Sequence, residues 1–184
     1  ATEKSAFTFD DLTISESVGP ANFTQDLADI ASLRGGRMAA VWEDNRLGPV
    51  SIFLQLFDNS GNAIGSNAAL IAGDEFDLSN PRICADTSGY FYVVWREENG
   101  GYLQAARFDS LVNQVTDVFF ISDTLELGYA GAYHAACLPD GRLAVTYAIH
   151  IGHRSYYSRA PLVTEPSSIS DWSAETVRDT GSRV

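Results

Sequence analysis

Basic side chains are scarce in this 184-residue chain. Its 12 lysines and arginines face 24 aspartates and glutamates, which gives a formal net charge of −12. Such an acidic surface repels phosphate backbones and anionic lipid headgroups, so nucleic acids and membrane surfaces are not expected as partners. The sequence also has no apolar run near the roughly 18 residues of a spanning helix, so no membrane span is predicted.

Cysteine is rare as well, with Cys84 and Cys137 as the only two. They are 53 residues apart, at nearly the same place in two successive sequence repeats. We interpret them as small apolar residues at equivalent buried positions. A disulfide needs Cα atoms within about 7 Å, and equivalent positions on adjacent repeats usually lie farther apart. We therefore expect two unbonded thiols, which fix no redox compartment.

A helical period is absent throughout, and a different period takes its place. A turn that ends in glycine leads into a short apolar run that ends in an aromatic residue, at 36–42, 89–95 and 141–147. The copies are 53 and 52 residues apart. A period of about 50 residues, each divided by turns into four short apolar segments, is typical of β-propeller blades or a related all-β array. We predict an all-β chain with about three four-stranded antiparallel blades stacked face to face.

The turn residues set the expected boundaries. A leading strand and turn occupy 1–20 and serve as the last strand of a preceding or closing blade. Blade 1 covers 21–75, blade 2 covers 76–124, and blade 3 covers 125–184 with a run-on into a further blade. The strands are expected at 7–14, 30–33, 38–42, 51–57, 68–71, 81–85, 90–95, 102–108, 118–121, 133–138, 143–148, 154–160 and 172–177.

Two groups of segments carry a family resemblance. The segments 29–31, 36–44 and 54–65 resemble the blade repeat of secreted bacterial β-propellers. The segments 139–143 and 156–162, with Asp171 and Trp172, resemble blades of sialidase-like (Asp-box type) propellers. The Asp-box turn needs Ser-x-Asp-x-Gly-x-x-Trp, of which only Asp171 and Trp172 remain, and the second repeat has 110–113 in place of a glycine-containing turn.

The resemblance implies an exported protein, located outside the cell, in the periplasm or on the cell surface. It implies a non-catalytic module that binds a glycan or a protein partner through its loops. The alternative is a fragment of a sialidase-like glycoside hydrolase, whose arginine triad, Tyr/Glu pair and acid cannot be matched to positions here. Whether the chain is an enzyme stays open, with a binding role favoured.

Three repeats do not close a ring, because propellers need about four to eight blades. Open sheet edges favour pairing with another chain. We expect either a fragment of a longer protein or a homo-oligomer in which copies complete the ring.

The loops after second strands and before first strands share one face of a propeller, where ligands usually bind. The candidate ligand-binding residues there are Glu43, Asp44, Arg46, Arg96, Glu97, Glu98, Tyr129, His134, His150 and His153. Glu43 with Glu97 or Glu98 could form the carboxylate pair of a glycoside hydrolase, although a solvated acidic loop is the simpler interpretation. His150 and His153 could ligate a metal, but no third ligand is near in sequence.

Calcium is the one cofactor that the sequence suggests. Asp74, Glu75 and Asp77 offer the oxygen ligands that Ca²⁺ prefers. Their spacing matches no known calcium loop, and a turn between blades explains them as well. Trp42, Trp95 and Tyr147 share one register; we expect them to pack between blades rather than stack on sugars.

Overall fold

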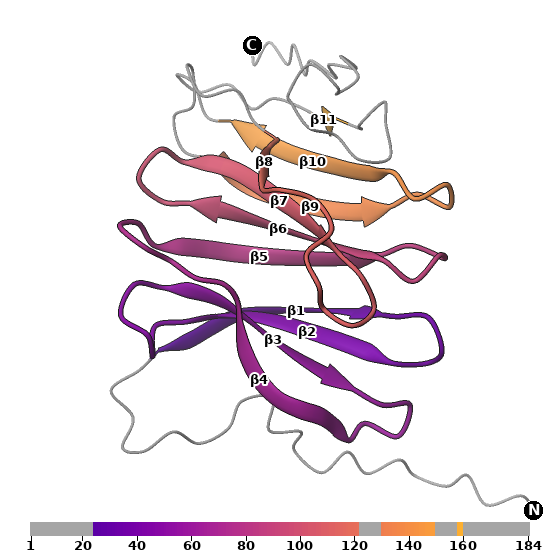
Figure 1. Cartoon of the computed structure of the whole chain (residues 1–184). Helices are drawn as coiled ribbons and strands as arrows, with labels where there is room; N and C mark the ends of the chain where they lie inside the picture. The colour runs from indigo at the N-terminus through magenta and orange to yellow at the C-terminus, as the bar shows by residue number, and fades with distance from the viewer. Residues whose placement is uncertain (1–23, 122–129, 150–157, 160–184) are drawn as a thin grey trace, which may run out of the picture.

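The computed structural model describes residues 24–121, 130–149 and 158–159, where all regular elements are strands in three antiparallel sheets. Figure 1 shows the sheets stacked on one another in chain order. Blade 1 is β1 (Gln25–Ser32), β2 (Met38–Asp44), β3 (Ser51–Phe57) and β4 (Ala63–Ile71). Blade 2 is β5 (Leu78–Ala85), β6 (Phe91–Glu97), β7 (Tyr102–Phe108) and β8 (Phe119–Phe120). The described strands of blade 3 are β9 (Ala130–Cys137), β10 (Leu143–Ile149) and β11 (Ser158–Arg159).

The predicted class, antiparallel four-stranded sheets in an all-β chain, is confirmed, with strand order following the sequence in the first two sheets. The expected strands at 7–14 and 172–177 lie outside the described residues. In the part of the chain that the structure covers, no helix is long and apolar enough to cross a membrane.

The first strand of each complete blade begins earlier than predicted. β1 starts at Gln25 and β5 at Leu78. In both strands a register shift interrupts the pairing with the second strand, and a residue with positive φ lies within it, Leu27 at 49° and Asn80 at 52°. Such bulges break the alternation of apolar and polar residues, which is why the pattern alone did not extend the strands this far.

The middle sheet has a core on each side because β6 alternates between its two faces. Phe91, Val93 and Trp95 belong to the core between blades 1 and 2. Tyr92 and Val94 belong to the core between blades 2 and 3. All five are fully buried, so the face-to-face stacking of sheets accounts for the apolar composition of this strand.

Two of the three aromatic residues that end the repeated motif pack between blades, as predicted, whereas the third, Trp42, packs within blade 1. Trp95 lies between blades 1 and 2, and Tyr147 lies between blades 2 and 3. Trp42 contacts the ring of Phe53 with centroids 6.1 Å apart, and its Nε1 donates a hydrogen bond to Asp44 at 3.2 Å. None of these three side chains is more than 6% exposed, so they offer little surface to a sugar.

The turn between the third and fourth strands has the same design in both complete blades. Asp58 accepts hydrogen bonds from the backbone N–H of Asn62 at 2.8 Å and from its side-chain amide at 3.0 Å. Asp109 accepts the matching pair from Asn113, both at 2.9 Å. These bonds hold the pKa of each aspartate below its usual range. The Asp58–Asn62 bonds thus account for the turn at 58–62.

The glycine of this turn is replaced by valine in blade 2. Gly61 has φ 83°, and Val112 adopts φ 69° at the matching place. A β-branched residue in the left-handed region is a strained conformation. Val112 also packs against the core between blades 1 and 2, and this burial offsets part of the strain. The Asp/Asn pair, rather than the glycine, therefore defines the turn.

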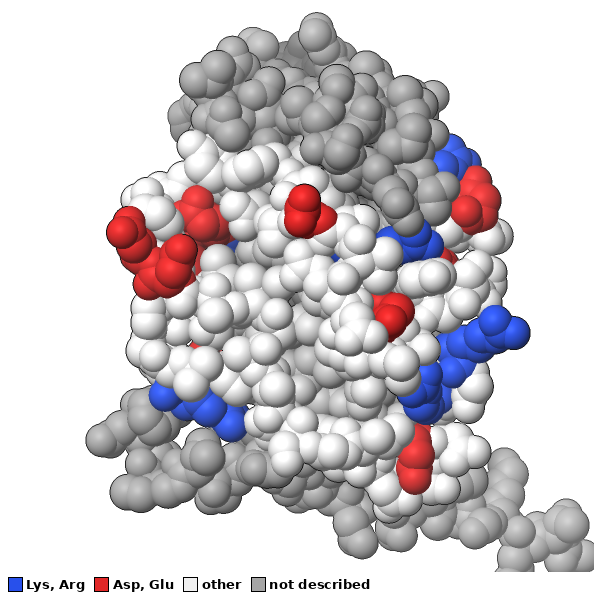
Figure 2. All heavy atoms as spheres, in the orientation of Figure 1, with Lys and Arg blue, Asp and Glu red and all other residues white. Residues whose placement is uncertain are grey.

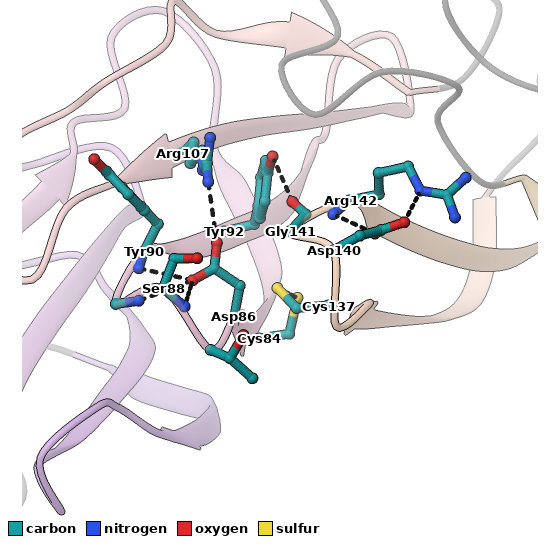
Figure 3. Close-up of polar contacts among 12 residues, drawn as sticks. Cys84, Asp86, Ser88, Tyr90, Tyr92, Arg107, Cys137, Asp140, Gly141 and Arg142 are labelled. Carbon is teal, nitrogen blue, oxygen red and sulfur yellow. Dashed lines mark hydrogen bonds and ion pairs between the residues drawn. The ribbon is translucent and has the colours of Figure 1, made fainter.

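A buried ion pair fixes the turn between β5 and β6 (Figure 3). Asp86 Oδ1 accepts hydrogen bonds from the backbone N–H groups of Ser88, Gly89 and Tyr90 at 2.8, 2.9 and 3.0 Å. Its Oδ2 accepts a bond from Arg107 Nη2 at 3.0 Å, and the two side chains are 1% and 6% exposed. The Arg107 guanidinium also lies 4.3 Å from the centroid of the Tyr90 ring.

Candidate ligand-binding face

Three loops lie together at one end of the stacked sheets, as the sequence predicted. They are 45–50, 72–77 and 98–101, which we call the loop face. Figure 1 places them at the left of the molecule, and Figure 2 shows acidic side chains gathered at that edge.

Glu43 connects blade 1 to blade 2 at this face. Its Oε1 accepts a hydrogen bond from the backbone N–H of Asn80 at 2.5 Å. The bulge between Ser79 and Arg82 interrupts the β5–β6 ladder, so this N–H is available to a carboxylate. The Tyr133 hydroxyl of blade 3 donates to the carbonyls of Asn80 and Ser79, the latter at 3.3 Å. The bulge therefore joins all three blades.

Two further carboxylates hold the loops in place. Asp77 Oδ1 accepts a hydrogen bond from the backbone N–H of Val50 at 2.8 Å, and the Asp77 carbonyl accepts one from Glu98 N at 2.9 Å. Glu98 accepts bonds from the Ser79 hydroxyl and from Arg96 Nη2, the latter at 2.9 Å. Glu98 is 34% exposed and can still reach a ligand.

The surroundings of Glu43 raise its pKa above the usual range. Burial is the largest cause that raises the pKa of Glu43, and the nearby charges of Asp26, Glu98 and Asp77 raise it further. The hydrogen bond from Asn80 opposes this only in part. A raised pKa is one property that a carboxyl group needs in order to act as a general acid.

We expect the stability cost of ionising Glu43 to appear in a Glu43→Gln variant. Because the pKa of Glu43 is higher in the folded state, its ionisation favours the unfolded chain. Wild-type protein should therefore lose stability relative to the variant as the pH rises from about 4, the ordinary range of glutamate, through the elevated pKa. Urea unfolding of both proteins across that range measures the difference. A wild type that keeps or gains stability relative to the variant as the pH rises would contradict the assignment, and Glu75→Gln provides an exposed control.

Asp44 and Arg46 are engaged inside blade 1. The Asp44 side chain is fully buried and accepts bonds from Arg46 Nε and Nη2 at 2.8 and 2.5 Å. Burial alone would raise the pKa of Asp44, but the bonds from Arg46 and Trp42 hold it below its usual range. Arg46 also donates to Asn67 at 3.0 Å and lies 4.5 Å from the Phe53 ring centroid. These contacts fix the start of the 45–50 loop, and ligand binding by the pair stays a prediction.

The other candidates divide into those that shape the loops and those that do not. Arg96 is 6% exposed and pairs with Glu98, while Glu97 accepts a bond from Asn99 N at 2.6 Å and so shapes the β6–β7 turn. His134 is exposed on β9, opposite Thr146 on the neighbouring strand. Tyr129, His150 and His153 lie outside the described residues.

The calcium ligands expected from sequence do not converge. Asp74 accepts a bond from Glu75 N, and Asp77 accepts one from Val50 N. Within the ranges the structure describes, no three His, Cys, Asp or Glu side chains are placed to hold a metal ion. Calcium binding here stays a prediction.

A hollow of about 330 Å³ opens on the loop face, between the β4–β5 link and the β6–β7 loop. It is lined by Pro49, Glu75, Phe76, Asp77, Glu98 and Asn99. Phe76 is 37% exposed, so an aromatic ring is presented to solvent among carboxylates and an amide. Sequence reasoning missed Phe76 and Asn99. The signal was a lone phenylalanine within the acidic segment 74–77, where no core position was expected.

A larger hollow of about 390 Å³ lies between β3 and β4 of blade 1 and residues 108–114 of blade 2. Its lining is mostly aliphatic, with Ser66 and Gln114 as the polar side chains. It lacks charged groups, and it is not on the loop face. The smaller hollow is therefore the better candidate for a polar ligand.

Comparison with known proteins supports the fold. No protein-family model matches the chain, and no curated protein matches it. Among solved structures it is similar to an endo-arabinase from Bacteroides thetaiotaomicron, with a TM-score of 0.59 and 14% sequence identity over 83% of this chain. The match spans 62% of the length of that enzyme, a propeller-type glycoside hydrolase. The sialidase-like character expected from sequence stays a prediction, and the chain is similar in fold to a propeller-type protein.

Proposed function

We propose that this chain is a glycan-binding propeller module whose ligand occupies the hollow on the loop face. The observation that carries the proposal is the combination, in one hollow, of the exposed Phe76 ring with the carboxylates of Glu75, Asp77 and Glu98 and the amide of Asn99. The apolar face of a sugar ring can pack on the aromatic ring, and its hydroxyls can donate to the carboxylates.

The charge of the face favours a neutral glycan. A net charge of −12 repels anionic sugars but not neutral ones. Arabinan is the first ligand to test, because the structurally similar protein is an endo-arabinase. The likeness in fold does not by itself select the sugar, so the panel includes galactan, xylan and a sialylated oligosaccharide.

Replacing Phe76 by alanine is expected to weaken binding of the preferred glycan about tenfold, because the ring that the sugar packs on is lost. Isothermal titration calorimetry of the wild type and the variant measures the ratio. Leu111→Ala is the matched control, since Leu111 is 74% exposed and lies in the turn after β7, at the opposite end of the sheets. Equal weakening by both variants would refute the site. Absence of binding to every glycan in the panel would favour a protein partner.

One observation favours glycoside hydrolysis as a second candidate: the elevated pKa of Glu43 beside Glu98 and Asp77. Glu43 would protonate the leaving oxygen, and Glu98 or Asp77 would act as base or nucleophile. Release of reducing sugar from arabinan by the wild type, reduced at least about 100-fold in Glu43→Gln, would support hydrolysis. A wild-type protein that binds arabinan without releasing sugar leaves the binding role.

Export from the cell and completion of a ring by a second copy belong to the same proposal. The exposed sheet edges of an incomplete ring of blades would provide surface for another copy.

A further inference from the structure

The sulfur atoms of Cys84 and Cys137 are neighbours, contrary to the expectation from sequence. The two Sγ atoms are 2.6 Å apart, where equivalent positions on adjacent blades were expected to hold the cysteines apart. Figure 3 shows the side chains pointing toward each other from two different blades. Ordinary non-bonded contacts between carbon atoms lie at about 3.5–4.0 Å, so these sulfur atoms are closer than packing alone requires.

The reason is an offset of one residue between the repeats. Cys84 lies five residues before Gly89, whereas Cys137 lies four residues before Gly141. Successive residues of a strand point to opposite faces of the sheet, so the offset reverses the direction of the second cysteine. Ala85, the true equivalent of Cys137, packs against the core between blades 1 and 2, while Cys84 lies in the core between blades 2 and 3. Cys137 therefore points back from blade 3 toward blade 2.

We propose that Cys84 and Cys137 form a disulfide that links blade 2 to blade 3. Both lie on the first strands of their blades, Cys84 near the end of β5 and Cys137 at the end of β9. No third ligand joins them in the described part of the chain, so the pair is suited to an S–S bond rather than to a metal.

The bond forms by two thiol–disulfide exchanges with a disulfide oxidant, either glutathione disulfide or a protein oxidoreductase. Cys137 is the more exposed thiol. Its thiolate attacks the oxidant, whose S–S bond breaks and releases one thiolate. Cys84 then gives its proton to solvent and attacks Cys137 Sγ, which expels the second thiolate. Two cysteine thiols are oxidised, and one oxidant disulfide is reduced to two thiols.

The order of attack follows from the environment of each thiol. The contact with Cys137 and then burial raise the pKa of Cys84, so this thiol stays protonated until the mixed disulfide is beside it. An oxidising compartment would maintain the bond, which agrees with the proposed export. The bond also ties together chain segments 53 residues apart, so it restricts the unfolded chain.

The test uses the full chain incubated with glutathione disulfide under native conditions. Digestion with trypsin without reductant is expected to give residues 83–96 joined to residues 108–142, at a mass two hydrogen atoms below the sum of the two peptides. Thiol titration of the unfolded, unreduced chain should find no free cysteine. Two free thiols and separate peptides would overturn the proposal. The experiment uses only the wild-type chain, so it does not depend on whether a variant folds.

Thermal unfolding gives an independent measurement. Reductant is expected to lower the Tm of the oxidised wild type by about 5–15 °C. The Cys84→Ala, Cys137→Ala double variant should show no change with reductant. A wild type whose Tm is the same in both redox states, or a double variant that responds equally, would contradict a cross-link between the blades.

Discussion

Replacing Trp95 by alanine is expected to lower the free energy of unfolding by about 3–5 kcal/mol, as measured by urea unfolding followed by circular dichroism. Trp95 is fully buried in the core between blades 1 and 2. The substitution removes a large apolar side chain and leaves a cavity between two sheets that are pinned by their loops. It also removes the bond from Trp95 Nε1 to Gln104 Oε1 at 3.0 Å, which leaves a partly buried acceptor without this donor.

A matched exposed ring provides the control for this variant. Phe120 is 42% exposed and makes an edge contact with Tyr102 at the margin of blade 2. Phe120→Ala should cost less than about 1.5 kcal/mol, because water already reaches the ring. Similar losses from both substitutions would mean that the sheets are not stacked face to face through Trp95.

Replacing Asp86 by alanine is expected to cost about 3–5 kcal/mol, because it breaks a buried ion pair by removing one partner. The Arg107 guanidinium, 6% exposed, would lose its carboxylate. The β5–β6 turn would also lose the acceptor of three backbone N–H groups. Urea unfolding measures the change. The stability of Asp86→Asn should fall between those of the wild type and the alanine variant, because the amide oxygen can still accept the turn bonds.

Asp140→Ala is the control for the ion pair. Asp140 pairs with Arg142 at 2.7 Å in the corresponding turn of blade 3, but the two side chains are 54% and 38% exposed. Water screens such a pair, so its loss should destabilise the protein far less than the loss of Asp86. An Asp86 variant no less stable than the Asp140 variant would exclude a structural role for the buried pair.

The repeated glycine-to-aromatic motif was enough to predict the fold, because it marks the second strand of each blade. The third strands at Ser51–Phe57 and Tyr102–Phe108 have the predicted boundaries, since continuous apolar runs between clear turns mark them. The start of β5 was missed because Asn80, with positive φ, interrupts the alternation. Local pattern cannot show a bulge that is stabilised by a contact with another blade, here the bond to Glu43.

The position of the loop face was predicted better than the contacts of its residues. The loops around Glu43 and Glu98 do share one end of the molecule. The sequence could not show that Asp44 is buried with Arg46, because Arg46 is held by Phe53 and Asn67, which belong to other strands of the sheet. Phe76 was overlooked since a single aromatic in an acidic loop has no periodic neighbour. The distance between the cysteines was misjudged because their spacing of 53 residues was treated as equal to the repeat of 52. The difference of one residue reverses the direction of the side chain.

The alternation along β6 constrains how this chain can change in evolution. Adjacent residues of that strand belong to different cores, with Val93 in the core between blades 1 and 2 and Val94 in the core between blades 2 and 3. An inserted or deleted residue in β6 would turn every later side chain of the strand toward the opposite core. A conservative substitution of similar volume disturbs one core at a time. Length variation between relatives should therefore be confined to the turns, and the middle strand should drift in identity while its residue count is preserved.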